Sequence, residues 1–196
     1  MPAAVIPHWN RRDLLERLLR NQREQTLPFD DILVVDNGST DDSVALAERA
    51  GARVLRLEQN LGFAAAVNRG IEAVHSDYVA ILNNDVTLDP NWLRRTREAC
   101  QEGAWFATGK ILREQNHTII DGTFDEISRG ACAHRCGAGK LDSPTWNRPR
   151  RIRMAPMTAC LFRTDLFHKV GLLDESFGSY LEDVEDRKST RLNSSH

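Results

Sequence analysis

Residues 32–41 are Ile-Leu-Val-Val-Asp-Asn-Gly-Ser-Thr-Asp, an unbroken aliphatic run that passes directly into turn-forming residues. A continuous run of Val, Ile and Leu is typical of a strand that is buried on both faces, as in a parallel sheet. The polar residues after it favour a turn, because their short side chains bind the local backbone. The stretch therefore predicts a buried parallel strand over residues 32–35, with the carboxylate of Asp36 at its carboxyl end.

Strands and helices are predicted to alternate on both sides of this stretch. Further strands are expected at residues 3–6, 54–57, 78–82, 104–108 and 157–162, and Pro7 should end the first of them. Helices are expected after caps at Asn10, at Ser39 or Thr40, and at Thr164, along the apolar stripe of Phe63, Val67, Ile71 and Val74, and after Asp89-Pro90. This alternation predicts an α/β fold with a mostly parallel sheet and helices on both faces.

Two segments depart from the alternating pattern. Residues 113–150 are rich in Gly, Arg and Pro, and we expect an irregular insertion there, with room for a small hairpin. Residues 187–196 are polar and aperiodic and look like translated vector sequence, so they are excluded from the fold prediction. We expect a single domain over residues 3–185, incomplete at its C-terminal end.

The composition excludes several classes of protein. Basic and acidic residues are mixed along the chain and the formal net charge is −2, so we expect no nucleic-acid partner. No apolar run approaches the roughly 18 residues of a membrane span, which favours a cytoplasmic protein, with peripheral contact at the inner face of the membrane left open. The spacing of Cys132, His134 and Cys136 is unlike the usual structural zinc patterns, so free thiols are predicted.

Carboxylates stand at the predicted ends of two strands. Ligands of open α/β sheets bind at the carboxyl ends of strands, where Asp36 and Asp85 should lie. The chain has neither a G-x-G-x-x-G turn nor a Walker loop, which disfavours an NAD, FAD or P-loop enzyme. Asp85, with Asn84 nearby, suits Mg²⁺ or Mn²⁺, and such an ion would let an acidic rim accept a diphosphate. The alternative is that both acids only stabilise local turns.

Five ordered segments carry a family resemblance: residues 5–11, 34–41, 60–71, 81–85 and 170–184. Together they resemble the family 2 glycosyltransferases of GT-A fold, and in particular the bacterial rhamnosyltransferase-like members. The resemblance implies a Rossmann-like single domain that binds a nucleotide-sugar. It also implies transfer with inversion from a UDP- or dTDP-sugar to a saccharide or lipid-linked acceptor, in the synthesis of cell-surface polysaccharide.

The resemblance also assigns roles to individual residues. Asp36 would accept a hydrogen bond from the pyrimidine ring, beside Pro7 and Trp9. The nucleoside would be bordered by Asn60, Gly62 and Asn68. Asp85 matches the last acid of the D-x-D-type element and would hold Mg²⁺ or Mn²⁺, with Asn84 next to it. Asp183 matches the general base, and its neighbour Glu182 is the rival for that role.

The chain departs from the family pattern at several positions. His8 stands where a small polar residue is common, Asn83 replaces the first acid of the D-x-D element, and Thr158 replaces a frequent glycine. Family members also continue past the Glu-Asp element with more helix and a late metal-binding histidine. These departures keep a second hypothesis open, a non-catalytic nucleotide-sugar-binding module or an inactive fragment. A third, a sugar-nucleotide pyrophosphorylase, would need a Gly-rich loop after the first strand, which is absent.

Two further groups of residues have two interpretations each. Arg148, Arg150, Arg151 and Arg153 would suit an anionic lipid or lipid-linked acceptor, although a solvated surface is the more common role of such a run. Trp92 and Trp105 are predicted to pack in the core rather than to stack on sugars.

Overall fold

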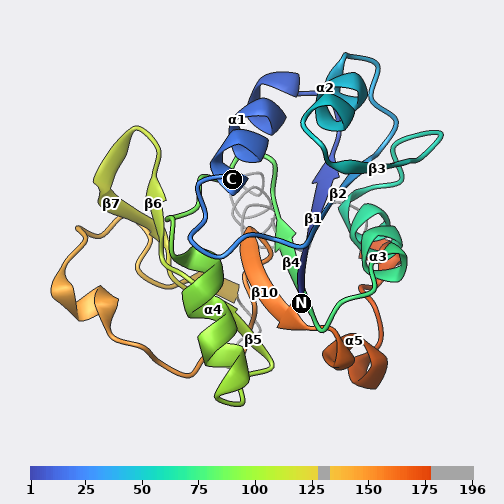
Figure 1. The fold of residues 1–196 in the computed structure, drawn as a ribbon. Helices are drawn as coiled ribbons and strands as arrows, with labels where there is room; N and C mark the ends of the chain where they lie inside the picture. The colour runs from blue at the N-terminus through green and yellow to red at the C-terminus, as the bar shows by residue number, and fades with distance from the viewer. Residues whose placement is uncertain (128–132, 178–196) are drawn as a thin grey trace, which may run out of the picture. The chain divides into compact units, whose positions relative to one another are not determined.

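The computed structural model describes residues 1–127 and 133–177 of the chain, which divide into two compact units. The sheet unit comprises Met1–Ala107 together with the segment that begins at Met157, and the hairpin unit comprises Thr108–Pro156. The sheet unit contains β1 (Pro2–His8), α1 (Arg12–Gln22), β2 (Asp31–Asp36), α2 (Ser43–Arg49), β3 (Arg53–Arg56), α3 (Phe63–Ala73), β4 (Tyr78–Leu82), α4 (Trp92–Gln101), all but the last residue of β5 (Phe106–Thr108), β10 (Ala159–Arg163), α5 (Asp165–Val170) and the 3₁₀ turn η2 (Glu175–Phe177) (Figure 1).

The central sheet has six strands in the order β3-β2-β1-β4-β10-β5. The pairs β1–β2, β1–β4 and β2–β3 are parallel, whereas β10 runs antiparallel to β4. The predicted mostly parallel α/β sheet is therefore confirmed. Since the chain moves from β1 to β2 and β3 and then crosses back to β4 on the other side of β1, the strand order reverses between β1 and β4. Such a reversal is where open α/β sheets bind their ligands.

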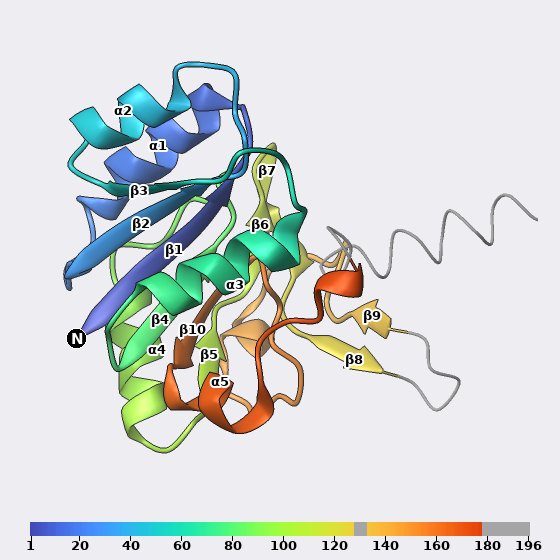
Figure 2. The same ribbon diagram turned by 90° about the vertical axis from the view of Figure 1, so that its right-hand side faces the viewer.

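Helices cover both faces of the sheet, with α1 and α2 on one side of β1–β3 and α3 on the other (Figure 2). Ile6 and Val34 point into the same apolar cluster as Leu15 and Leu18 of α1, and all four are almost fully buried. On the opposite face, a methyl group on Gly70 of α3 would lie 2.3 Å from Cγ1 of Val5. The glycine therefore allows α3 to lie directly on β1, which fixes the helix that follows the Asn60–Gly62 turn.

The first strand continues past the proline that was predicted to end it. Pro7 pairs with Val35 of β2, and β1 extends to His8. The reason lies in the register. The pairing of β1 with β4 ends at Val5 and Ile81. Asn37 donates to the carbonyl of His8, so the backbone N–H and C=O groups of the even-numbered residues of β1 point toward β2. The nitrogen of Pro7 points away from β2, to the side where β1 is no longer paired with β4. The missing N–H therefore costs no hydrogen bond.

Two predicted helix caps are also wrong. Asn10 is left-handed, with φ 53°, and α1 begins at Arg12 without a side-chain cap. Neither Ser39 nor Thr40 caps α2, which begins at Ser43, where Asp41 accepts from the backbone N–H and the hydroxyl. In each case the polar side chain makes a longer-range contact instead of a local cap.

The hairpin unit is more regular than predicted. It contains two antiparallel pairs, β6 (Ile111–Arg113) with β7 (Asn116–Gly122) and β8 (Asp125–Ile127) with β9 (Ala133–Arg135), followed by the 3₁₀ turn η1 (Pro144–Asn147). Ile120 is fully buried. In the described parts of both units, no helix has the length and apolar character needed to cross a lipid bilayer.

Candidate functional site

The candidate site lies at the carboxyl ends of β1, β2 and β4, where the strand order reverses. We call His8, Asp36, Asn37, Asn84 and Asp85 the strand-end site. His8 and Asp36 are paired directly across β1 and β2, and Asn84 and Asp85 follow the end of β4. The sheet therefore brings together the two sequence-predicted acids from positions far apart in the chain.

A hydrogen bond joins the ends of β1 and β4. Nδ2 of Asn84 lies 3.0 Å from Nδ1 of His8, whose side chain is 2% exposed. With the amide nitrogen as donor, Nδ1 accepts and the proton of a neutral imidazole resides on Nε2, which has no hydrogen-bond partner among the described residues. Burial lowers the pKa of His8 despite the opposing charges of Asp41 and Asp36. A neutral imidazole therefore positions Asn84 next to the candidate metal ligand.

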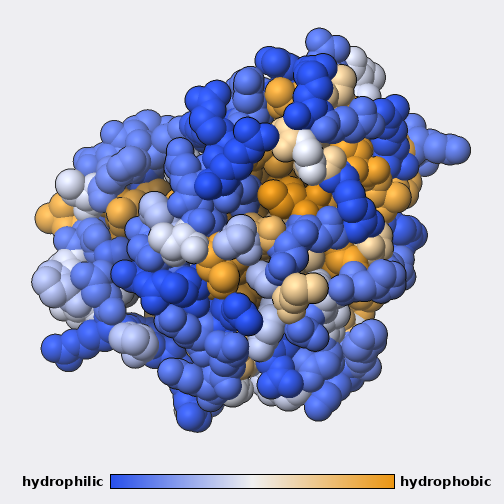
Figure 3. Space-filling view, in the orientation of Figure 1, coloured by the Kyte–Doolittle hydropathy of each residue, from blue (hydrophilic) through white to orange (hydrophobic). Residues whose placement is uncertain are grey.

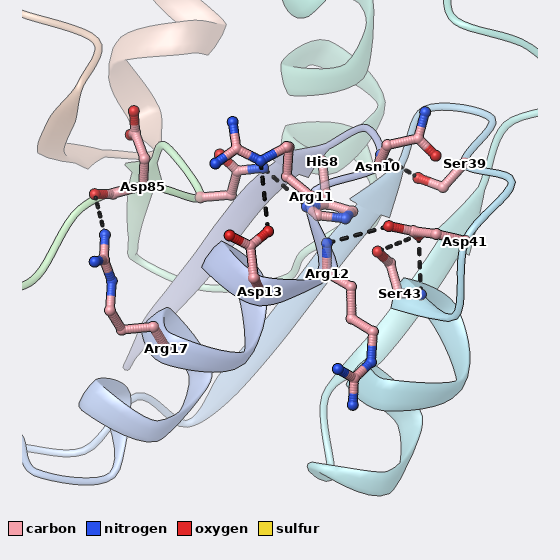
Figure 4. Close-up of polar contacts among 11 residues, drawn as sticks. His8, Asn10, Arg11, Arg12, Asp13, Arg17, Ser39, Asp41, Ser43 and Asp85 are labelled. Carbon is pink, nitrogen blue, oxygen red and sulfur yellow. Dashed lines mark hydrogen bonds and ion pairs between the residues drawn. The ribbon is translucent and has the colours of Figure 1, made fainter.

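The loops after β1 and β2 are tied together by polar side chains (Figure 4). The N–H of Asn10 donates to Oγ of Ser39 at 2.8 Å, and its side-chain oxygen accepts from the N–H of Thr40 at 3.0 Å. The N–H of Arg12 donates to Asp41 at 3.1 Å. Desolvation alone would raise the pKa of Asp41, but hydrogen bonds from Ser43 and Arg12 outweigh it and the pKa is lowered. Asp41 therefore stays an anion that anchors the start of α1.

Asp36 lies at the base of this loop and is 4% exposed. Both of its carboxylate oxygens accept from the N–H of Ser39, at 3.3 and 3.4 Å. Because each oxygen has a second lone pair, the carboxylate can still accept from a ligand. The structure thus permits the predicted contact to a pyrimidine ring without testing it.

The turn before α3 is held by the amide of Asn37, which is 5% exposed. Its Nδ2 donates to Oδ1 of Asn60 at 2.9 Å and to the carbonyl of Gly62 at 3.1 Å, and its Oδ1 accepts from the N–H of Leu61 at 2.9 Å. Gly38 makes the approach possible, because a Cβ there would lie 2.8 Å from the backbone of Gln59. Asn60 and Gly62 are thereby fixed relative to Asp36.

Asp85 is exposed at the end of β4, and its carboxylate points away from Arg17 in Figure 4. Arg17 donates instead to the main-chain oxygen of Asp85 at 3.3 Å. No other described residue bonds to the carboxylate, so its oxygens remain available to a ligand. One carboxylate suits Mg²⁺ or Mn²⁺, since these ions take one or two protein carboxylates and complete their shell with water and substrate phosphates. Asp85 therefore fits the predicted metal.

The other predicted nucleotide contacts from β1 differ in exposure. Pro7 is partly buried in the strand, whereas Trp9 is 53% exposed and offers an indole ring on which a base could stack. In the space-filling view, apolar residues lie in the region where Figure 1 draws β1 and β2, with hydrophilic residues around them (Figure 3). An apolar floor with polar groups at its edge is typical of small-molecule sites.

Asn68 has a different set of contacts from those expected. The side chain is 2% exposed, its Nδ2 donates to the carbonyl of Leu173 at 2.9 Å, and its Oδ1 accepts from the N–H of the same residue. Glu175 accepts from the same amide at 3.0 Å. Asn68 thus docks the segment before η2 on α3, and its contact with a nucleoside stays a prediction. Glu182 and Asp183 lie outside the described residues.

The aromatic and basic residues fall into two classes. Trp92 is buried as predicted, but Trp105 is 38% exposed, with the cationic groups of Arg163 and Lys169 at 4.7 and 4.6 Å from its ring centroid. In the hairpin unit, Arg150 lies over Trp146 at 5.8 Å from the ring centroid. The arginine run is therefore engaged with aromatic rings at one position at least.

Two members of the site, His8 and Asn37, were not identified as functional from the sequence. The pairing of His8 with Asn84 had no local signal, because the residues are joined only by the adjacency of β1 and β4. Asn37 carried a signal, since a polar residue directly after a buried strand and before a glycine with φ 78° is typical of a turn that holds a second loop.

A family model described as glycosyl transferase family 2 matches residues 3–171 of the chain. An N-acetylglucosaminyl-diphospho-decaprenol L-rhamnosyltransferase of Mycobacterium tuberculosis (strain CDC 1551 / Oshkosh) is 27% identical over 198 aligned positions, which cover 87% of this chain and 64% of that protein. The chain spans about half the length of the curated relatives that it matches.

Solved structures share the fold at low identity. A mannosyltransferase from Pyrobaculum calidifontis, in complex with GDP-Man and Mn²⁺, superposes with a TM-score of 0.62 at 17% identity, covering 89% of this chain and 47% of that one. S. aureus TarS in complex with UDP gives a TM-score of 0.63 at 18% identity, covering 91% and 52%. These similarities confirm the predicted GT-A fold.

Proposed function

The chain belongs to glycosyl transferase family 2, and we propose that it binds a UDP- or dTDP-sugar at the strand-end site. The sugar would be transferred with inversion to a saccharide or lipid-linked acceptor in the synthesis of cell-surface polysaccharide. Support comes from the convergence of Asp36, Asn84 and Asp85 on the strand ends where the order of the sheet reverses. This convergence is the main observation that supports the proposal.

The nucleoside half of the donor would lie against the ends of β1 and β2. Asp36 would accept from the ring N–H of uracil or thymine, and Trp9 would provide the stacking surface beside Pro7. Asn60 and Gly62 would border the nucleoside from a turn whose geometry depends on Asn37, and Asn68 would border it from α3. A pyrimidine is favoured because Asp36 and the turn after Pro7 match the base-binding segments of the family, and the imide N–H of uracil or thymine is a donor from which a buried carboxylate can accept.

The diphosphate half would lie at the end of β4. Mg²⁺ or Mn²⁺ held by Asp85 would neutralise the leaving diphosphate. Asn84, positioned by His8, would orient this end of the site. Asp183 would take the proton of the acceptor hydroxyl, and a single displacement by that hydroxyl inverts the anomeric centre. The relatives support this scheme: the M. tuberculosis protein is named as an L-rhamnosyltransferase, and the P. calidifontis enzyme was solved with a nucleotide-sugar and Mn²⁺.

Calorimetry with UDP, dTDP, GDP and ADP, each with Mn²⁺ and with EDTA, tests the proposal. We expect UDP or dTDP to bind more tightly than GDP or ADP, and to lose affinity in EDTA. Equal affinity in both conditions would contradict the metal at Asp85, and tighter binding of GDP would contradict the pyrimidine assignment. Binding of the nucleotide-sugar without detectable hydrolysis of a tritiated donor would instead favour the non-catalytic module or inactive fragment.

A further inference from the structure

The β8–β9 hairpin carries three side chains with metal-binding atoms on one face. Glu126 and His134 are directly opposite each other in the antiparallel register. Cys136 lies two residues beyond His134, and because side chains alternate along a strand, its sulfur emerges on the same face. We call Glu126, His134 and Cys136 the hairpin cluster. Within residues 1–127 and 133–177 it is the one group of three His, Cys, Asp or Glu side chains whose ligand atoms converge.

The distances within the hairpin cluster match those between the ligands of a tetrahedral zinc ion. Nε2 of His134 lies 3.5 Å from Oε2 of Glu126 and 3.6 Å from Sγ of Cys136, and all three atoms lie within 4.8 Å of one another. Zinc bonds of about 2.1 Å to nitrogen and oxygen and about 2.3 Å to sulfur, at tetrahedral angles, separate nitrogen from oxygen by about 3.4 Å and nitrogen from sulfur by about 3.6 Å. The remaining pair, Oε2 of Glu126 and Sγ of Cys136, lies within 4.8 Å and must close to about 3.6 Å in the same geometry.

We propose that Glu126, His134 and Cys136 bind a borderline-soft divalent transition metal of the Zn²⁺ class, with water as the fourth ligand. A thiolate and an imidazole favour Zn²⁺ or Co²⁺ over Mg²⁺ and Mn²⁺, which prefer oxygen ligands. The proposed site is therefore chemically different from the one at Asp85. It concerns the hairpin unit alone and does not depend on the proposed transferase activity.

The backbone holds Cys136 in place for this role. Its N–H donates to the carbonyl of Phe124 at 2.8 Å, and its carbonyl accepts from the N–H and the hydroxyl of Thr123 at 3.0 and 2.8 Å. The next residue, Gly137, has φ 80°, and a Cβ there would approach side chains at 3.3 Å. The sulfur is thus positioned by a continuation of the β8–β9 ladder and by a tight turn.

On the opposite face of the same hairpin, the charged residues pair with one another and not with the hairpin cluster. Arg135 pairs there with Asp121 at 3.2 Å and with Asp125 at 3.7 Å. An exposed Glu–His pair alone would be an ordinary surface contact that contributes little to stability. The presence of a partly buried thiol as a third, convergent group distinguishes the hairpin cluster from such a pair.

The sequence alone disfavoured this site, and the fold explains why. The third ligand, Glu126, lies ten residues before Cys136 and meets it only through the hairpin register. Cys132, which the sequence grouped with His134 and Cys136, lies outside the described residues and is not part of the proposed ligand set.

Titration of the EDTA-stripped full chain with Co²⁺, followed by absorption spectroscopy, tests the proposal. We expect the intense visible bands of tetrahedral Co²⁺ and a thiolate-to-cobalt charge-transfer band, both lost on addition of Zn²⁺. Cys136→Ser should abolish the charge-transfer band, and the near-isosteric Glu126→Gln should weaken Co²⁺ binding at least about tenfold. Cys132→Ser and Asp85→Asn are the matched controls and should keep the spectrum of the unmodified chain.

Two results would overturn the assignment. One is a Co²⁺ isotherm that is the same for the unmodified chain and Cys136→Ser. The other is a charge-transfer band that disappears in Cys132→Ser. Circular dichroism of each variant without metal checks that a lost spectrum does not reflect a lost fold. Zn²⁺ should also raise the Tm of the unmodified chain and leave that of Cys136→Ser unchanged, because a ligand stabilises only the state that binds it.

Discussion

The strand-end site and the hairpin cluster collect polar side chains in opposite ways. At the strand-end site, side chains from three strands meet because the sheet places strands that are distant in sequence side by side, and buried amides such as Asn37 then fix the loops. In the hairpin cluster, Glu126 and His134 are neighbours through one antiparallel register. The first arrangement offers oxygen atoms from Asp36 and Asp85, and the second offers oxygen, nitrogen and sulfur.

This difference indicates that the type of metal ligand determines how much support the surrounding chain must provide. Oxygen ligands for a labile, substrate-bridging metal need loops that are held firmly from outside, because the ion keeps much of its water and supplies little organisation itself. A thiolate–imidazole pair binds its metal strongly enough to organise a short, exposed hairpin. The two sites should therefore respond independently to substitution.

If proton transfer depends on the proposed base, Asp183→Asn should cause the largest loss of all. Removal of a general base typically lowers the rate by about 10²- to 10⁴-fold. We expect a loss of that order in sugar transfer, with unchanged UDP affinity. Cys136→Ser should leave the transfer rate unchanged. Transfer that survives in Asp183→Asn but not in Glu182→Gln would assign the base to Glu182.

The next largest effect should come from Asp85→Asn, which preserves shape and removes the charge that holds the metal. In Mn²⁺ we expect UDP affinity to drop at least about tenfold, equivalent to about 1.4 kcal/mol. In EDTA the variant and the unmodified chain should bind UDP equally. Calorimetry under both conditions measures the difference, and an equal loss of affinity in EDTA would show that Asp85 acts through the fold rather than through the metal.

The contribution of a loop asparagine to the free energy of unfolding should also differ between the two units. Asn37→Ala removes a buried amide and leaves the N–H of Leu61 without its partner, while the carbonyl of Gly62 keeps only the N–H of Ala66. We expect a loss of about 1–3 kcal/mol in the free energy of unfolding, measured with urea. Asn116 is the control in the hairpin unit, since its exposed side chain bonds, within the described part of the chain, only to nearby Thr118. Asn116→Ala should stay within about 0.5 kcal/mol, and equal losses would contradict the difference between the loops.

The sequence predicted the sheet unit well, because apolar periodicity reports local burial. The strand at residues 78–82 has the predicted bounds, and the helix stripe from Phe63 forms α3. The prediction that Pro7 ends the first strand was wrong, because a proline interrupts a strand only when its nitrogen faces a neighbouring strand. Asn10 misled because the same side chain that caps helices also binds a distant loop, here Thr40. Local patterns cannot distinguish these alternatives.

The candidate site was only partly accessible to sequence. Asp36 and Asp85 stand at strand ends, and strand ends can be predicted from where aliphatic runs stop. The partners of His8, Asn37 and Asn68 could not be predicted, since each lies between 23 and 107 residues away in the chain. The same holds for the hairpin cluster, whose strands are too short to show a period.

The smallest effect should be a pH dependence of stability that arises at His8. Burial lowers its pKa in the folded state, whereas in the unfolded chain the imidazole titrates near its ordinary value of about 6.5. Below that pH the unfolded state binds a proton that the folded state refuses. The contribution of His8 to stability is therefore complete above about pH 6.5 and is lost as the pH falls toward the folded-state pKa, with a slope of at most about 1.4 kcal/mol per pH unit.

His8→Asn isolates this contribution, because its amide can still meet Asn84 but does not titrate. Urea unfolding of both proteins from pH 8 to pH 5 should show a smaller loss of stability in the variant. The imidazole resonance of His8 in the NMR spectrum of the unmodified chain should meanwhile stay at its neutral position below pH 6.5. An imidazole that protonates in the folded state above that pH would mean that Asp36 and Asp41 outweigh burial. Asn84 would then be positioned by a charged histidine, and the strand-end site would differ less from the hairpin cluster than the geometry indicates.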